Sequence, residues 1–155
     1  MASVWTKRSA AAVGLVALVA ACGGPPPPPP PTVAQLTLSA TADANPDPTG
    51  RASPTVVHVY ALQPGAPFAI GDYDALTGGE LGELGETMKR IGRLVIVPGE
   101  QTEKTFELPD GTSDVGVTAA FRQVETAGWR DSKPIQPNAV TELNATVGAN
   151  EVSLE

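Results

Sequence analysis

The chain has 155 residues, and its ten basic and seventeen acidic side chains give a net charge of −7. An acidic chain is repelled by nucleic acid and by anionic lipid, so the charge argues against DNA or RNA binding and against membrane attachment through a basic patch. With one cysteine and one histidine, the chain can form neither an internal disulfide nor a zinc site, which needs several such ligands.

The first 21 residues have the pattern of a secretory signal. Lys7 and Arg8 form a short basic start, and the run from 10 to 21 is uncharged and nearly all small or apolar. This run is shorter than the roughly 20 residues that a membrane-spanning helix needs. The sequence therefore predicts a cleaved signal peptide at residues 1–21 and not a permanent span.

Residues 19–22 read Val-Ala-Ala-Cys and resemble a bacterial lipobox, whose cysteine becomes the lipidated first residue of the mature protein. The alternative is an ordinary signal cut near Ala21, which would leave Cys22 as a free thiol. Bacterial lipoproteins carry several acyl chains, palmitate among them, on this cysteine. The resemblance implies the same for Cys22. Similar lipoproteins with Asp directly after the cysteine stay in the inner membrane. Here that position is Gly23, which implies an outer-membrane protein that faces the periplasm. Cleavage would leave eight basic and seventeen acidic residues, a net charge of −9, so attachment would depend on lipid.

A run of prolines from 25 to 31 follows the cysteine. Proline fixes φ and removes the backbone donor, so this run is expected to be polyproline II. At about 3.1 Å per residue, it would hold the following domain roughly 20 Å from the anchor. Residues 22–31 are thus predicted to be a lipidated cysteine with a spacer; the alternative is a proline-rich ligand for a recognition domain.

Residues 32–155 show hydrophobic alternation of period two, which is typical of β-strands. Pro98-Gly99 and Asp110-Gly111 are turn signals between such runs. The pattern predicts one all-β domain, an antiparallel β-sandwich of about seven or eight strands. The predicted strands cover 36–42, 57–62, 94–97, 102–108, 115–122, 141–147 and 152–154.

One segment departs from this alternation. Asp72 is a candidate helix cap, and Gly78-Gly79 is a candidate helix end. Apolar residues then recur at helical spacing, although two glycines weaken such a helix by about 1 kcal/mol each. We expect residues 68–88 to form a helical insertion that covers the sandwich. The residues at helical spacing are Leu81, Leu84, Met88 and Ile91.

No set of residues indicates catalysis. His58 lies within a predicted strand, and no nucleophile motif accompanies it. The acidic residues at 43–47 fail the calcium-loop pattern, because Pro48 and Pro54 stand where that pattern needs Gly and Glu. A loop whose Asx side chains satisfy local backbone groups is the better interpretation. We expect no enzymatic activity.

The most distinctive stretch of the domain is 45–62, which reads Asn-Pro-Asp-Pro-Thr-Gly-Arg-Ala-Ser-Pro and then Thr-Val-Val-His-Val-Tyr-Ala-Leu. It resembles the signature of the TssJ-type (VasD/SciN-like) lipoprotein of the type VI secretion system. Further matches are Phe68 with the 72–76 segment, Pro98-Gly99-Glu100, and 115–122 followed by Trp129-Arg130. Ala52 departs from the pattern, because the family carries proline there.

The resemblance implies a transthyretin-like sandwich with helical elements, no catalysis and no cofactor. It implies an outer-membrane lipoprotein that binds the periplasmic C-terminal domain of a TssM-type inner-membrane subunit and, through it, a TssL-type subunit, as a scaffold for secretion. In relatives the loop between the first two strands contacts the partner. In this sequence the residues of that loop expected to contact the partner are Asn45, Pro46, Asp47, Pro48, Thr49, Gly50 and Arg51.

The composition of this loop is compatible with binding. Its prolines reduce the conformational freedom lost on docking, and Arg51 offers a planar donor suited to a carboxylate. The alternative is a purely structural connection. Two other functions remain open. The first is a periplasmic carrier or carbohydrate-binding sandwich, which would show an exposed aromatic platform such as Trp129. The second is a lipid-anchored hydrolase, for which the sequence offers no nucleophile and base.

Overall fold

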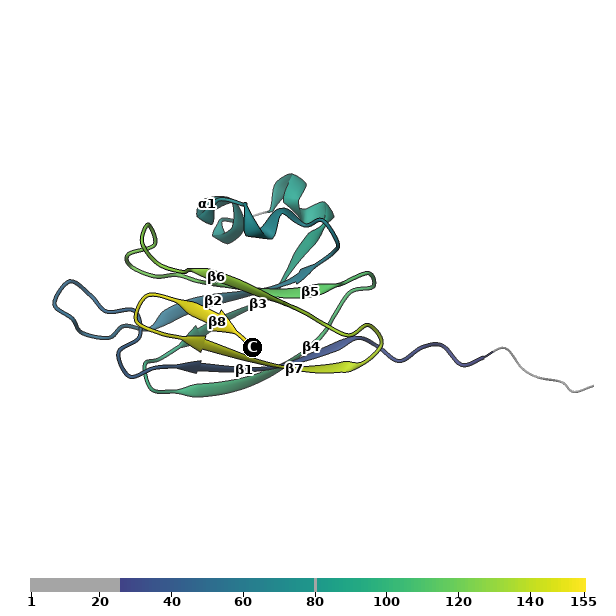
Figure 1. Ribbon diagram of the computed structural model, residues 1–155, viewed down its shortest axis with the longest axis horizontal. Coiled ribbons are helices and arrows are strands. Elements are labelled where there is room, and N and C mark those ends of the chain that lie inside the picture. The colour runs from purple at the N-terminus through teal and green to yellow at the C-terminus, as the bar shows by residue number, and fades with distance from the viewer. Residues whose placement is uncertain (1–25, 80) are drawn as a thin grey trace, which may run out of the picture.

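Two four-stranded sheets face each other in the computed structural model, which describes residues 26–79 and 81–155 (Figure 1). The predicted signal peptide and Cys22 lie outside the described residues. One sheet has the strand order β4-β1-β7-β8, and the other has the order β3-β2-β5-β6. The strands are β1 Val33–Ala40, β2 Thr55–Leu62, β3 Met88–Ile96, β4 Gln101–Glu107, β5 Asp114–Ala119, β6 Arg130–Pro134, β7 Val140–Val147 and β8 Val152–Leu154.

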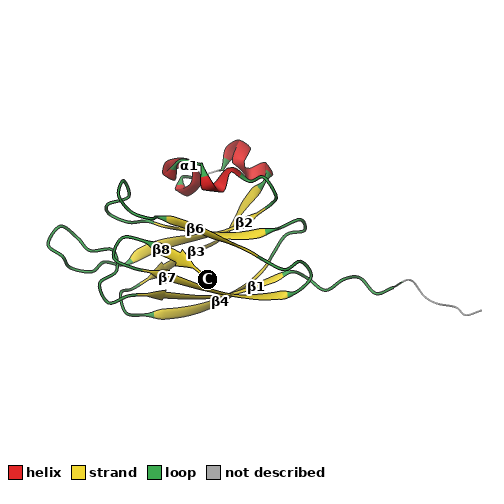
Figure 2. Ribbon diagram, viewed as in Figure 1, coloured by secondary structure: helices red, strands yellow, loops and turns green. Residues whose placement is uncertain are grey.

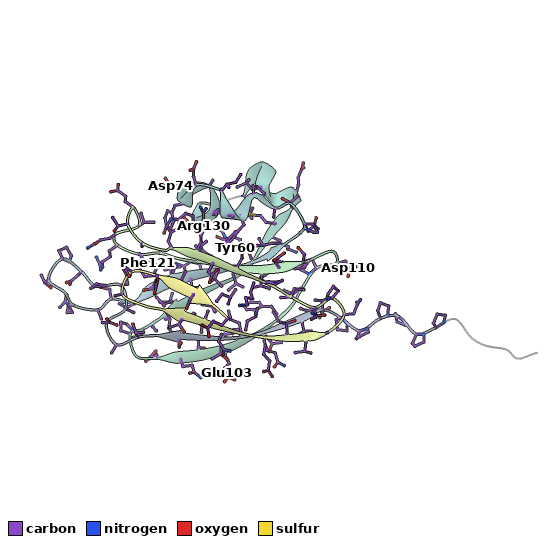
Figure 3. All side chains as sticks on the ribbon, in the orientation of Figure 1. Tyr60, Asp74, Glu103, Asp110, Phe121 and Arg130 are labelled. Carbon is purple, nitrogen blue, oxygen red and sulfur yellow. The ribbon has the colours of Figure 1, made fainter. Side chains whose placement is uncertain are left out.

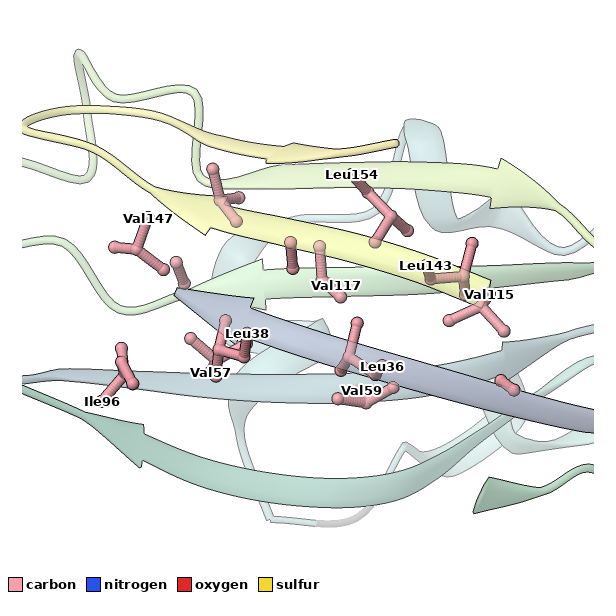
Figure 4. Packing of buried hydrophobic residues seen from close by; sticks show 14 of the residues in the cluster. Leu36, Leu38, Val57, Val59, Ile96, Val115, Val117, Leu143, Val147 and Leu154 are labelled. Carbon is pink, nitrogen blue, oxygen red and sulfur yellow. The ribbon is translucent and has the colours of Figure 1, made fainter. Parts of the chain in front are cut away.

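The main core fills the space between the two sheets. In β1, Ala34, Leu36 and Leu38 are buried while the intervening residues face outward, as the period-two pattern predicts. Each fully buried Val or Leu side chain contributes about 1.5–3 kcal/mol. Figure 4 shows the two layers interdigitating through Leu36, Leu38, Leu143, Val147 and Leu154 from one sheet and Val57, Val59, Ile96, Val115 and Val117 from the other.

Most strand pairs are antiparallel, and the predicted sandwich is confirmed. The exception is β1 with β7, which run parallel with Val33 opposite Val140. The expectation of a wholly antiparallel arrangement is therefore wrong at this pair. The physical reason is the connection: the chain reaches β7 from β6 in the other sheet, and so enters it at the same end as β1.

Helical segments cover the outer face of the β3-β2-β5-β6 sheet (Figures 1 and 2). They are the 3₁₀ turn η1 Pro67–Ala69, the helix α1 Tyr73–Thr77 and the 3₁₀ turn η2 Gly82–Glu86. This arrangement explains why β2 is apolar on both faces: Tyr60 and Leu62 face the helical layer and pack with Phe68 and Leu76 in a second, smaller cluster. The expectation of a covering helical insertion agrees with the structure.

The structure corrects two details of the sequence interpretation. Met88 and Ile91, which the helical spacing assigned to a helix, lie in β3. Residues three apart in a strand point to opposite faces, so Met88 reaches the helical layer and Ile91 packs against the main core. The strand β6 was not predicted, because its Arg-Asp-Ser-Lys-Pro sequence has no apolar alternation; it is an edge strand in which three of the five residues are exposed.

The strand directions divide the loops between two ends of the sandwich (Figure 1). Residues 26–31, all exposed and without helix or strand, lead into β1 at what we call the tether end. The opposite end, which we call the distal end, gathers four connections: 41–54, 97–100, 120–129 and 148–151. Among the described residues, no helix is long and apolar enough to cross a membrane.

Candidate functional site

The loop that joins β1 and β2 is the longest connection at the distal end and projects from it (Figure 1). Asp47 organises its tip. One carboxylate oxygen accepts the backbone N–H groups of Thr49 at 2.9 Å and Arg51 at 3.0 Å, and also the Thr49 hydroxyl at 2.6 Å. The other oxygen lies 3.4 Å from Nε of Arg51. The Thr49 hydroxyl and the Arg51 N–H hold the pKa of Asp47 below its ordinary value of 3.8.

Asn45 fixes the base of the loop to its neighbours. Its side chain is buried, and its backbone is left-handed with φ of 48°, a conformation that Asn tolerates better than most residues. Its Oδ1 accepts the N–H of Arg122 at 2.8 Å, and its Nδ2 donates to the carbonyl oxygens of Ala120 at 3.3 Å and Pro54 at 3.5 Å. Asn45 thus couples the 41–54 loop to the 120–129 loop.

The seven predicted contact residues therefore fall into two groups. Asn45 is buried, Pro46 and Asp47 are half-buried, and these three residues form the base of the loop. Residues 48–51 form an exposed tip, in which Gly50 has φ of 82° and Arg51 has 85% of its side chain accessible. The ion pair with Asp47 uses Nε of Arg51, at the base of the guanidinium fork. This tip is the part that a partner can reach.

A pocket of about 270 Å³ opens beside this loop at the distal end. Three separate loops contribute to it, and for this reason no sequence motif signals it. Phe121 lies at the distal end in Figure 3 and is buried apart from a small fraction of its surface. The lining residues are Asn45, Pro46, Phe121, Gln123, Ala127, Ala149 and Asn150.

The described part of the chain contains one histidine, His58, with no cluster of metal ligands around it. His58 is buried in β2, where desolvation, followed by the charges of Arg90 and Arg93, lowers its pKa below 6.5. Within residues 26–79 and 81–155, no group of three or more His, Cys, Asp or Glu side chains is placed to hold a metal. The carboxylate of Asp47 accepts backbone N–H groups of its own loop, as the interpretation of an Asx side chain that satisfies local backbone groups predicts.

Trp129, the candidate aromatic platform, packs against two neighbouring side chains. It is half-buried, with the Tyr73 ring edge-on at a centroid distance of 5.1 Å and the Arg130 guanidinium 4.5 Å from its centroid. A sugar ring that stacked on the indole of Trp129 would have to compete with these two contacts. The structure therefore gives no support to the carbohydrate-binding alternative at this residue.

Two arginines hold the helical layer in place, a role that the sequence did not indicate. Arg130 is labelled with Tyr60 between that layer and the sheet in Figure 3, and the Arg90 guanidinium lies 5.8 Å from the centroid of the Tyr60 ring. The Tyr60 hydroxyl donates to the carbonyl of Leu76 at 2.6 Å. These donors satisfy carbonyls that short helices leave unpaired. Arg90 donates to the carbonyls of Leu76, Gly78 and Gly79, and Arg130 donates to those of Phe68 and Gly71.

Comparisons with solved structures agree with this architecture. TssJ1, a type VI secretion lipoprotein from Pseudomonas aeruginosa, is 28% identical over 81% of this chain and 96% of its own, with a TM-score of 0.75. Lip from Serratia marcescens, a membrane-bound component of the type VI secretion system, is 18% identical over 81% and 96%, with a TM-score of 0.71. A chain in a structure of the T6SS protein TssM C-terminal domain from EAEC is 23% identical over 79% and 97%, with a TM-score of 0.63.

Comparison with curated protein sequences gives no match. The model of one protein family, however, matches residues 32–151, which is most of the chain and nearly all of the sandwich. That family is described as type VI secretion lipoprotein, VasD, EvfM, TssJ, VC_A0113. The chain therefore belongs to the TssJ/VasD family of type VI secretion lipoproteins.

Proposed function

We propose that this lipoprotein is anchored in the outer membrane through Cys22 and faces the periplasm. In this position it binds the periplasmic C-terminal domain of a TssM-type inner-membrane subunit, and through that subunit a TssL-type protein. Its role is mechanical, as the outer-membrane end of an envelope-spanning scaffold, and it requires no catalysis. The contact surface is the tip of the 41–54 loop.

The observation that carries the proposal is the position of this loop relative to the anchor. The tether enters β1 at Val33, and the loop leaves β1 after Ala40, so a whole strand separates them. At about 3.3 Å per residue, that strand places the loop about 25 Å further from the membrane than the tether. In Figure 1 the two lie at opposite ends of the molecule. A sandwich tethered in this way presents residues 48–51 to the periplasm.

The internal order of the loop also supports a binding role. Its conformation is set by the Asp47 contacts and by Asn45, and so the tip has little freedom left to lose on docking. The exposed Arg51 guanidinium is suited to a bidentate contact with a partner carboxylate. The family match and the similar chain in a structure of a TssM C-terminal domain support a TssM-type subunit as the expected partner.

A titration of the mature lipoprotein in detergent with the periplasmic domain of the TssM-type subunit tests the proposal. We expect Arg51→Glu to weaken binding by about tenfold or more, because it replaces the attraction between Arg51 and a partner carboxylate by repulsion between two carboxylates. The matched control is Lys133→Glu, an exposed charge reversal in β6, which should change affinity by less than about twofold. Absence of wild-type binding would overturn the proposed function, whereas equal affinities of wild type and Arg51→Glu would remove Arg51 from the interface.

The role of the anchor is tested separately. A Cys22→Ser chain should fold and bind the partner domain in solution, but it should fail to support type VI secretion in cells. Immunoblotting of fractionated cells checks that the variant accumulates in the periplasm. Normal secretion by this variant would show that membrane attachment is not what the protein contributes.

A further inference from the structure

We propose that the distal pocket receives one uncharged aromatic side chain projecting from the partner, and that this ring anchors the complex. The inference rests on the proposed function, because it identifies the partner chemistry that the distal end recognises. It assigns a binding role to residues outside the 48–51 tip. The key residues are Phe121, Ala127 and Ala149, which come from two loops other than 41–54.

The pocket is preformed, because hydrogen bonds join all three loops that line it. The N–H of Asn45 donates to the carbonyl of Gly148 at 3.2 Å, and the N–H of Gly128 donates to that of Asn150 at 2.9 Å. The Asn45 side chain accepts the N–H of Arg122, which joins the 41–54 loop to the 120–129 loop. Walls held in this way do not have to order on binding, which favours affinity.

The lining selects an uncharged group. Pro46, Phe121, Ala127 and Ala149 supply apolar surface, and the remaining lining residues carry amide groups without an ionisable side chain. An apolar cavity of about 150 Å³ is enough to bind benzene, whereas pockets for drug-sized ligands begin at about 300 Å³. A volume of about 270 Å³ therefore suits one aromatic side chain. Buried aromatic anchors of this kind dominate the energy of many interfaces.

The charges beside the pocket specify the surroundings of that ring. Glu125 and Glu151 are exposed on the same two loops that provide Ala127 and Ala149, and the exposed cation on these loops, Arg122, donates its Nε–H to Ser53 Oγ. Opposite charges across an interface favour correct docking. The partner surface should therefore present an aromatic side chain flanked by basic residues at this point, while its carboxylates face Arg51 on the neighbouring loop.

Indole is the probe that tests the pocket without the partner. Titrated into the ¹⁵N-labelled mature lipoprotein in detergent, it should shift the backbone amide signals of Gln123, Ala127, Ala149 and Asn150, with millimolar affinity (about 4 kcal/mol of binding free energy). Amide signals at the tether end, in 108–113 and 135–139, should not move. Absence of shifts, or shifts spread evenly over the surface, would overturn the assignment of this pocket as an aromatic site.

Ala149→Trp tests the role of the pocket in the complex, because the added indole fills it from within. Its affinity for the TssM-type periplasmic domain should fall by about tenfold or more, whereas Ala149→Ser, which leaves the pocket open, should bind within about twofold of wild type. Val140→Trp adds the same bulk at an exposed site on the tether end and should also bind normally.

If wild type binds and Ala149→Trp binds equally well, the inference is wrong while the proposed function stands. If wild type does not bind, the proposed function fails, and the indole titration alone decides the pocket.

Discussion

Asn45→Ala is the substitution that most directly perturbs the support of the binding loop. In the folded protein, Asn45 makes two well-formed side-chain hydrogen bonds, at 2.8 Å with the N–H of Arg122 and at 3.3 Å with the carbonyl of Ala120. It also adopts φ of 48°, which alanine disfavours. The variant loses both contacts and keeps the strained backbone, so we expect lower stability and a looser loop.

The magnitude follows from these terms. A net contribution of about 1 kcal/mol for each hydrogen bond gives about 2 kcal/mol, and the left-handed conformation costs alanine about 1–2 kcal/mol more. Water can enter from the adjacent pocket to hydrate the released groups, and this lowers the loss. We therefore expect Asn45→Ala to reduce the free energy of unfolding by about 2–4 kcal/mol.

Urea denaturation followed by circular dichroism measures this loss, and Asn45→Gly is the matched control. Glycine loses the same hydrogen bonds but adopts the left-handed backbone without strain, so it should be less destabilising than alanine. The difference between the two variants reports the strain, and the glycine value reports the side chain. A free energy of unfolding for Asn45→Ala within about 0.5 kcal/mol of wild type would refute the reasoning, since surface substitutions without a structural role give that result.

Three further predictions concern the face beneath the helical layer. Gly116→Ala places a Cβ 2.8 Å from the Phe68 ring and should lower the free energy of unfolding by about 1–3 kcal/mol in urea titrations; an unchanged midpoint would mean that the ring moves freely. Tyr60→Phe removes the hydroxyl bond to the Leu76 carbonyl and should lower stability by about 0.5–1.5 kcal/mol by the same measurement, with no loss if that bond contributes nothing. His58 has a folded pKa below its unfolded value near 6.5, so stability should be complete above that pH and decline as the pH falls below it. A His58→Gln chain should lack this component of the decline between about pH 7.5 and pH 5, and parallel curves for the two proteins would contradict the assignment.

Much of the sandwich could be predicted because burial on one face leaves a period-two record in the sequence. The alternation of Leu36 and Leu38 with polar neighbours indicates a strand whichever strand it pairs with. The pairing itself leaves no such record, and so the parallel β1–β7 contact was missed. The polar edge strand β6 carries no alternation at all. The helical spacing of Met88 and Ile91 is a coincidence, because these two residues lie on opposite faces of β3.

The candidate site was predicted only in part, for a related reason. The composition of 45–51 indicated an ordered loop, but nothing in the sequence shows that Asn45 is buried whereas Arg51 is exposed. That difference depends on Arg122, which lies 77 residues further along the chain. The distal pocket depends on three loops that meet only after both sheets have formed. Contacts between distant segments decide these features, so local patterns cannot reveal them.

The central claim is that the distal end of this lipoprotein binds the TssM-type periplasmic domain. Hydrogen–deuterium exchange of the mature protein, measured by mass spectrometry with and without that domain, tests it most directly. We predict slower exchange in 41–54, 120–129 and 148–151 when the partner is bound, and no change in the tether-end loops 108–113 and 135–139. Protection confined to the tether end or to the helical layer at 67–86, with none in 41–54, would contradict the claim.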